Sequence, residues 1–229
     1  MTPAPAPAEF SLAVCLSRHP YFRNLGPQSL NLLVQAATMH QFAAEEIIFL
    51  EGDPSAGLWV VERGRVKIYK ISLEGREHIL HMPGPGDSFN DISALDGGPN
   101  PANAAALTAV TAWAIGSQDL RAMLHTDPAL ALAALEVLTA RVRTLVRQIE
   151  DLALYSVPAR LARFLLAQMD DATSGRPPVT RAAIAAHLAT TPESVSRALR
   201  MLEEAGAIRF DRHRIVIVDP DLLRTLALG

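Results

Sequence analysis

The stretch that decides the fold is residues 180–205, TRAAIAAHLATTPESVSRALRMLEEA. Thr180 is a good N-cap, because its hydroxyl can accept a hydrogen bond from a free amide of the first helical turn. Thr190 and Thr191 interrupt the helical pattern, and Pro192 suits the first position of a second helix, where its missing amide costs nothing. The stretch therefore predicts two short helices joined by a tight turn.

The second helix is predicted to have an apolar and a polar face. Its inward positions are Val195, Leu199 and Leu202. Its outward positions are Glu193, Ser194, Ser196, Arg197 and Arg200. Gly206 ends the helix, and the alternating segments 207–210 and 214–218 predict a short hairpin. Helix, turn, helix and a two-stranded wing is the order of a winged helix-turn-helix.

The outward side chains have the chemistry of a DNA reader. Arg197 can donate two hydrogen bonds to the O6 and N7 of guanine, and Glu193 can accept one from the amine of cytosine. Residues four apart share one helical face, and the short Ser196 suits a base edge. The alternative is a surface ion pair between Glu193 and Arg197 worth ~0.2–0.5 kcal/mol. The capped helix and the wing favour DNA.

Upstream of this stretch the pattern is that of a sheet domain. A helix is predicted over Gln28–Thr38. Short apolar strands punctuated by glycine follow at 46–50, 58–61, 66–71, 78–82 and within 104–115. Short strands at this spacing predict a sandwich or barrel.

A long helix is predicted between the two parts. From Ala131 onward, apolar residues recur at spacings of 4, 3, 4, 3, 4 and 3, which is a heptad seam. The predicted dimerisation residues of the seam are Leu135, Leu138, Val142, Leu145, Ile149 and Leu152. The alternative is a helix that covers only its own domain. Strict 3-4 spacing favours a parallel homodimer, whose two reading helices would meet a palindromic site.

Composition limits the other possibilities. Net charge is −3, but residues 156–229 carry 10 Lys and Arg against 8 Asp and Glu, so this end is mildly positive. The one cysteine, Cys15, excludes an internal disulfide and a one-chain iron–sulfur cluster with four thiolates. Apolar runs are shorter than the roughly 20 residues of a membrane helix, and the Pro-rich start lacks a cationic flank. We expect a cytoplasmic protein with no membrane contact.

The whole chain from about residue 10 resembles the Crp/Fnr family of bacterial transcription regulators. The resemblance rests on FLEGDPSAGLWVVERGRVKIYK, the GPGDSFNDI turn, the long helix and TPESVSRALRMLEEAGAI. It implies an α+β protein: an N-terminal cyclic-nucleotide-binding-like β-roll, a long dimerisation helix and a C-terminal winged helix-turn-helix. The expected ranges are a disordered tail at 1–9, an effector-sensing domain at 10–127, the dimerisation helix at 128–155 and the DNA-binding domain at 156–229, with a hinge near Ser156, Val157 and Pro158.

The resemblance also sharpens the expected partners. The recognition helix has the E-x-x-S-R pattern of the Fnr-like branch at Glu193 to Arg197, which implies a palindrome close to TTGA-N6-TCAA. The partners are then double-stranded DNA, a second copy of the chain, RNA polymerase and a small-molecule effector. The expected backbone contacts to DNA are Thr180, Arg181, Thr191, Arg200, Arg212 and His213.

The effector is where the family pattern fails. The candidate pocket residues are Phe89, Asn90, Asp91, Asn103 and Ala104. Members that bind cyclic AMP use a Gly-Glu pair and an Arg-Ser pair, whereas this chain has Asn90-Asp91 and Asn103-Ala104 at the corresponding places. No Lys or Arg occurs between Glu77 and Leu120, and a buried phosphate needs compensation of its charge. We therefore expect weak or no binding of cyclic AMP.

Two alternatives stay open. The sequence of the effector domain most resembles the branch that responds to nitric oxide through haem. The histidines that could supply one axial haem ligand are His19, His40, His78, His81 and His125. Otherwise the chain is a constitutive DNA-binding regulator with a vestigial pocket. An enzyme is not expected, since no nucleophile turn, phosphate loop or metal-ligand spacing is present in the sequence.

Overall fold

The structure is a computed structural model. It describes Leu12, Leu16, His19, 21–23, 25–170, 179–211 and 214–229, apart from the side chains of 169 and 170. Contacts divide the chain into two compact units. Unit 1 comprises Met1–Val66 and Pro83–Ala140, and unit 2 comprises Lys67–Met82 and Arg141–Gly229. The domain boundaries expected near residues 127 and 155 stay a prediction.

The strands pair antiparallel. They are β1 (Ala37–Phe42), β2 (Ile47–Phe49), β3 (Leu58–Arg63), β4 (Val66–Ile71), β5 (Glu77–His81), β6 (Ser88–Phe89), β7 (Asn103–Ala106), β8 (Val110–Ile115), β9 (Ile208–Phe210) and β10 (Ile215–Ile217). In unit 1 one sheet has the order β1-β8-β3-β6, and β2 pairs with β7. β4 pairs with β5, and β9 with β10.

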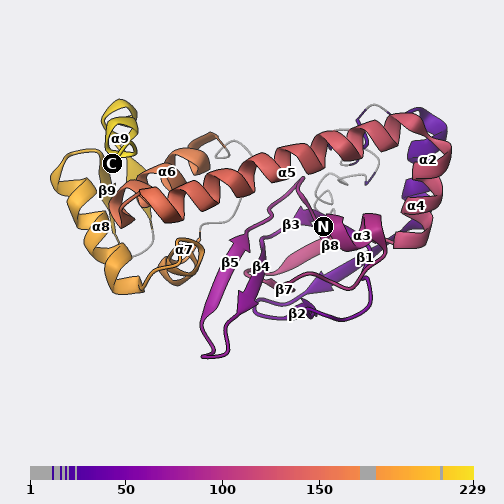
Figure 1. Ribbon diagram of the computed structural model, residues 1–229, viewed down its shortest axis with the longest axis horizontal. Coiled ribbons are helices and arrows are strands. Elements are labelled where there is room, and N and C mark those ends of the chain that lie inside the picture. The colour runs from indigo at the N-terminus through magenta and orange to yellow at the C-terminus, as the bar shows by residue number, and fades with distance from the viewer. Residues whose placement is uncertain are drawn as a thin grey trace, which may run out of the picture. The chain divides into compact units, whose positions relative to one another are not determined.

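The helices complete the predicted α+β fold: a sheet-rich N-terminal part, one long helix and a C-terminal helix-turn-helix with a wing (Figure 1). They are α2 (Pro27–Ala36), α3 (Asp91–Asp96), α4 (Ser117–Thr126), α5 (Pro128–Leu154), α6 (Val157–Asp170), α7 (Arg181–His187), α8 (Pro192–Glu204) and α9 (Pro220–Leu226). The long helix α5 has 27 residues.

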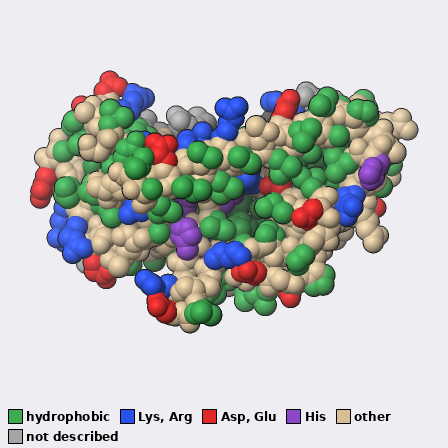
Figure 2. All heavy atoms as spheres, in the orientation of Figure 1, with side chains coloured by type: hydrophobic (Ala, Val, Ile, Leu, Met, Phe, Trp, Pro, Cys, Tyr) green, Lys and Arg blue, Asp and Glu red, His purple; other side chains and the backbone are tan. Residues whose placement is uncertain are grey.

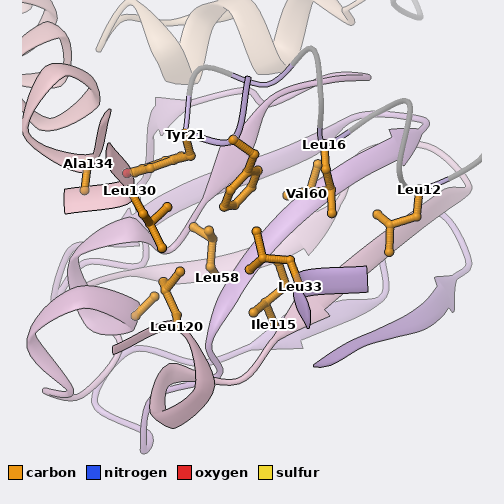
Figure 3. Packing of buried hydrophobic residues seen from close by; sticks show 12 residues of the cluster. Leu12, Leu16, Tyr21, Leu33, Leu58, Val60, Ile115, Leu120, Leu130 and Ala134 are labelled. Carbon is orange, nitrogen blue, oxygen red and sulfur yellow. The ribbon is translucent and has the colours of Figure 1, made fainter. Parts of the chain in front are cut away.

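The core of unit 1 lies between its sheet and its helices. Leu58 of β3, Ile115 of β8, Leu120 of α4 and Leu130 of α5 are each at most 1% exposed and point toward one another (Figure 3). Burying each such side chain contributes about 1.5–3 kcal/mol. Leu130 fixes the first half of α5 to this core.

Gly64 separates β3 from β4, as its place in the sequence predicts. Its backbone φ is +89°, a value that residues with a Cβ rarely adopt. A Cβ there would also overlap the carbonyl oxygen of Ala109. The turn therefore requires glycine.

The core of unit 2 is built by helix packing. α8 packs on α6 and α7, and α9 packs on α6. The apolar side chains buried there include Leu161, Leu165, Ile184, Val195, Leu199, Leu202, Ile208 and Leu223. This packing holds α8 by one face and leaves the other outside.

One sequence prediction is wrong in its limits. The helix predicted over Gln28–Thr38 ends at Ala36, and residues 37–42 form β1, which the sequence did not predict. The reason is that β1 finds backbone partners along the whole of β8. Its exposed positions show no strand-like alternation of apolar residues.

Candidate nucleic-acid interface and effector region

The helix-turn-helix begins at the predicted cap. The Thr180 hydroxyl accepts a hydrogen bond from the Ala183 amide at 3.2 Å, so α7 starts at Arg181. Ile184 and Leu188, which are four residues apart, are both buried. Thr180 is therefore occupied as a helix cap.

The second helix is capped in the same way. The Thr191 hydroxyl accepts from the Ser194 amide at 3.2 Å, and Pro192 occupies the first position of α8. Ala189 in the turn has φ +49°, a left-handed conformation that reverses the chain without glycine. The tight turn predicted at Thr190–Thr191 is thus confirmed, and its strained residue is Ala189.

α8 shows the two predicted faces. The buried residues are Val195, Ala198, Leu199 and Leu202, each at most 2% exposed. Glu193, Arg197 and Arg200 are exposed, while Ser194 and Ser196 are half-buried. Basic side chains gather over α8 (Figure 2). The apolar face anchors α8, so its outer face is free to meet a partner.

Glu193 and Arg197 form one electrostatic group. The backbone amide of Glu193, followed by the Thr191 hydroxyl, lowers the pKa of the Glu193 carboxyl below its usual value, and the Arg197 charge adds to this. Arg197 Nη2 donates to Ser194 Oγ at 3.0 Å. The guanidinium is therefore oriented by a serine one turn earlier, a contact that was not predicted from the sequence.

Two other predicted DNA contacts are engaged within the protein. The Ser196 hydroxyl donates to the Pro192 carbonyl at 2.9 Å, so its oxygen keeps only acceptor capacity. Arg181 Nη2 donates to the Asp211 carbonyl at 2.6 Å, and its guanidinium lies 5.2 Å from the centre of the Phe210 ring. Arg181 thus braces the wing. Arg212 and His213 lie outside the described residues.

The heptad seam lies on the outside of α5. Its members Leu135, Val142, Leu145, Ile149 and Leu152 are 45–67% exposed, and Leu138 is half-buried. Hydrophobic side chains form a band along α5 in Figure 2. Exposed apolar surface of this extent on one helix is typical of an interaction site.

The candidate effector residues point into unit 1. Phe89 is 1% exposed, and its ring centre lies 5.8 Å from that of Trp59. Asp91 accepts from the Ser88 hydroxyl at 2.9 Å, and Asn103 Oδ1 accepts from the Glu51 amide at 3.0 Å. The Asn90 amide group donates to the Gly57 carbonyl at 3.0 Å. Ala104 is buried and pairs with Phe49 across the β2–β7 ladder.

Asn100 is the centre of the hydrogen bonds in this region, and it was not among the residues predicted from the sequence. It is 2% exposed, and its Oδ1 is approached by the Ala56 amide, the Asn90 side chain and the Ser93 hydroxyl at 3.0–3.3 Å. Its own amide group donates to the Leu50 carbonyl at 3.3 Å. Pro99 and Pro101 flank it, and this was the one local signal of a fixed turn.

Unit 1 also buries a cation outside the stretch that lacks Lys and Arg. Although no cation lies between Glu77 and Leu120, Arg65 just upstream is 2% exposed, so a guanidinium is buried in unit 1. Arginine is seldom buried unless it is paired. Within the described ranges, no three His, Cys, Asp or Glu side chains gather closely enough to hold a metal ion.

Comparisons with known proteins agree with this architecture. The cyclic nucleotide-binding domain model matches residues 39–127, and the Crp-like helix-turn-helix model matches residues 159–226. Transcriptional regulator LdrP of Thermus thermophilus is 30% identical over 194 residues, which cover 79% of this chain and 92% of the relative. The CRP-like cAMP-activated global transcriptional regulator of Mycobacterium tuberculosis is 29% identical over 215 residues, covering 91% and 96%.

The solved structure of FixK2 from Bradyrhizobium japonicum superposes with a TM-score of 0.74 at 26% identity, covering 83% of this chain and 96% of that one. The chain belongs to the Crp/Fnr family of transcription regulators.

As a Crp/Fnr protein, the chain has the predicted cyclic-nucleotide-binding-like domain, long helix and winged helix-turn-helix. Its relatives are named as transcription regulators and not as enzymes, which is consistent with the expectation for this chain. Among the helices of the described ranges, none combines the length and apolar composition needed to cross a bilayer.

Proposed function

We propose that this Crp/Fnr regulator acts as a homodimer that binds a palindrome close to TTGA-N6-TCAA and is gated by an effector other than cyclic AMP. The observation that carries the DNA half is the exposed pair Glu193 and Arg197 on the buttressed helix α8. The pair presents a carboxylate acceptor and a guanidinium donor over adjacent base pairs of one major groove.

Ser196 completes the proposed reader. Its hydroxyl hydrogen is directed to the Pro192 carbonyl, so the side chain meets a base through its oxygen or its methylene. Thr180, Thr191 and Arg200 remain proposed backbone contacts, together with Arg212 and His213. For Arg181 a phosphate contact would compete with its bond to the wing.

The test of base reading is binding to duplexes with TTGA and TTAA half-sites, measured by fluorescence anisotropy. Arg197→Ala should weaken binding to the TTGA site by ~1–3 kcal/mol, about 5- to 150-fold, and should lose the preference between the two sites. The matched control is Arg121→Ala, an exposed arginine of unit 1, which should bind as wild type. Wild-type discrimination by Arg197→Ala would contradict the assignment.

The homodimer half rests on the exposed seam of α5. In a two-fold dimer, two reading helices reach successive major grooves, and each seam residue meets a partner instead of water. Leu145→Glu should give monomers in sedimentation velocity and abolish binding to the palindrome. Arg147→Glu places the same carboxylate on the same helix away from the seam and should stay dimeric. Unchanged sedimentation of Leu145→Glu would refute the seam.

The residues of the candidate pocket decide which effector is proposed. The Mycobacterium tuberculosis relative is named as cAMP-activated. In this chain the side-chain amide nitrogen of Asn90 and the Oδ1 of Asn103 are bonded within the domain, and no cation lies in the stretch that should cradle the phosphate. Both observations support weak binding of cyclic AMP.

A more specific hypothesis from the sequence is that the protein binds haem and responds to nitric oxide. It needs one axial histidine. His19 does not suit this role, because its Nδ1 accepts a hydrogen bond from the Tyr21 amide, and its ring stacks on Tyr21 and contacts the tilted ring of Phe22. The absorption spectrum after haem addition tests the rest: a Soret band at fixed stoichiometry would support it, and its absence would exclude haem as the effector.

The second candidate function is a constitutive regulator with a vestigial pocket. It is favoured by the same internal hydrogen bonds around Asn90 and Asn100. A true ligand raises the melting temperature by mass action. No thermal shift with cyclic nucleotides, haem or small anions, together with full-strength DNA binding by the unliganded protein, would favour this candidate over the gated one.

A further inference from the structure

Two histidines join the hairpin β4–β5 to α7 within unit 2, where β5 lies beside α7 (Figure 1). His78 Nδ1 lies 2.9 Å from the Ala186 carbonyl oxygen, and His187 Nδ1 lies 2.9 Å from the Ile79 carbonyl oxygen. The two bonds cross the contact in opposite directions. Each element donates one side-chain hydrogen bond and accepts one.

These bonds determine where the ring protons are. A carbonyl oxygen can only accept, so each Nδ1 must carry a proton. In the neutral rings Nε2 therefore has no proton, and acid adds a proton at Nε2 without breaking either hydrogen bond. Acid therefore acts through charge and not through loss of a donor.

The surroundings of His187 oppose that charge. Its ring is half-buried against the Phe164 ring of α6, with centres 5.5 Å apart. Burial lowers the pKa of His187 below its usual value; the Ile79 carbonyl and the charge of Asp151 act the other way, and a charge on His78 would lower the pKa further. The neutral form is thus the one that fits the contact.

The charged groups on α5 and α6 would do little to stabilise a positive charge on His187. Asp151 of α5 is paired with Arg163 of α6, whose Nε lies 2.6 Å from its carboxylate. Arg160 of α6 donates to the Leu188 carbonyl at 2.9 Å, one residue beyond His187. Two cations therefore accompany the one anion on this side.

His78 has a cation opposite it as well. Lys70 of β4 is its register partner in the hairpin. The neighbouring Glu77 is paired with Lys67 at 2.6 Å. A second positive charge at this place would repel both the lysine and a protonated His187.

We propose that His78 and His187 form an acid-sensitive latch that holds the β4–β5 hairpin on the first helix of the DNA reader, and that protonation of both rings releases it. Neutral rings give two hydrogen bonds at no cost in charge, whereas two imidazolium ions in a half-buried contact repel each other. Gln148 of α5 donates to the Leu80 carbonyl at 3.0 Å and does not titrate. Release is therefore confined to the α7 side of the hairpin.

The test is hydrogen–deuterium exchange of the full-length protein between pH 7.5 and 5.5, corrected for intrinsic exchange. Amides of residues 77–82 and 181–190 should lose protection together, by roughly ten-fold, over this range. Equal corrected protection at both pH values would overturn the proposal. The readout needs no DNA, so it is independent of the proposed DNA sequence and oligomeric state.

Variants separate the charge from the hydrogen bond. His187→Asn keeps an N–H donor near the place of Nδ1 and does not titrate, so it should keep protection at pH 7.5 and lose most of the acid response. His187→Ala should lose protection at both pH values; if it does not fold, His78→Asn gives the same test as His187→Asn. His125→Asn, an exposed histidine of unit 1, is the control. A wild-type acid response in His187→Asn would refute the latch.

Discussion

The outer face of α8 and the candidate effector region are both rich in polar side chains, but they use them in opposite ways. On α8 the charged groups of Glu193 and Arg197 are exposed, and Arg197 is oriented by a neighbour on the same helix. In unit 1 the side-chain amide nitrogens of Asn90 and Asn100 and the Oδ1 of Asn103 are turned inward onto backbone groups.

This difference separates recognition from folding. An outward group contributes little to stability and keeps its hydrogen-bonding capacity for a partner. An inward group is held by bonds that are costly to leave unmade. Changes on α8 should therefore alter DNA binding with a small effect on stability, and changes in the effector region should do the reverse.

The largest effect that would sharpen this comparison is expected at Asn100. Asn100→Ala removes the acceptor shared by Ala56, Asn90 and Ser93, and should lower the free energy of unfolding by about 3 kcal/mol. Chemical denaturation measures it. Asn31→Ala, at an exposed asparagine of α2, should change little. Wild-type stability of Asn100→Ala would mean that this network is not structural.

The second largest effect is expected from acid, which should lower the folding stability of unit 1 through its buried His19. Burial lowers the pKa of His19 to about 4, from 6.5 in the unfolded chain, with Asp91 opposing. The neutral ring is favoured by folding, so this stability is complete above pH 6.5 and is lost as pH falls toward 4. Denaturation at pH 5 should show a loss of about 2 kcal/mol relative to pH 7.5. His19→Gln should lack that part of the pH dependence; an identical slope would contradict the assignment.

The cap of α8 should give an intermediate effect. Thr191→Ala leaves the Ser194 amide without its side-chain acceptor and should cost about 1 kcal/mol of stability. Thr190→Ala changes the same residue type one position earlier, outside the cap, and serves as the control. Thermal unfolding of both variants measures the difference. Equal stability of the two variants would show that the cap contributes nothing.

The smallest effect is expected from a change at Ser194. A loss of folding stability instead of DNA affinity would contradict the difference drawn between α8 and the effector region. Ser194→Ala removes the acceptor that orients Arg197, so affinity for the palindrome should fall by a few-fold, about 1 kcal/mol or less, at unchanged stability. Ser194→Thr retains a hydroxyl and should restore binding. A stability loss without an affinity loss would make Ser194 a folding residue.

What the sequence could predict was local. Thr180, Thr191 and Pro192 mark helix starts by their own chemistry, and Val195 and Leu199 mark a buried face by spacing alone; the structure confirms each. These signals lie within one or two helical turns, so a single sequence contains them.

What the sequence could not predict depends on distant partners. Asn100 acts through Leu50 and Ala56, which are 50 and 44 residues away. The strand β1 exists because β8 supplies its ladder. The bonds of His78 and His187 join residues 108 apart. Composition and periodicity contain none of these pairings, since only packing creates them.

The contact between β5 and its helical neighbours has one more consequence. β5 pairs with β4 along one side only, and the other side of such a strand offers unpaired carbonyls to any other chain that could add to it. Here the carbonyls of Ile79 and Leu80 are already taken by His187 and Gln148. Side-chain donors thus occupy two carbonyls of this open edge, which hinders another chain from pairing with it.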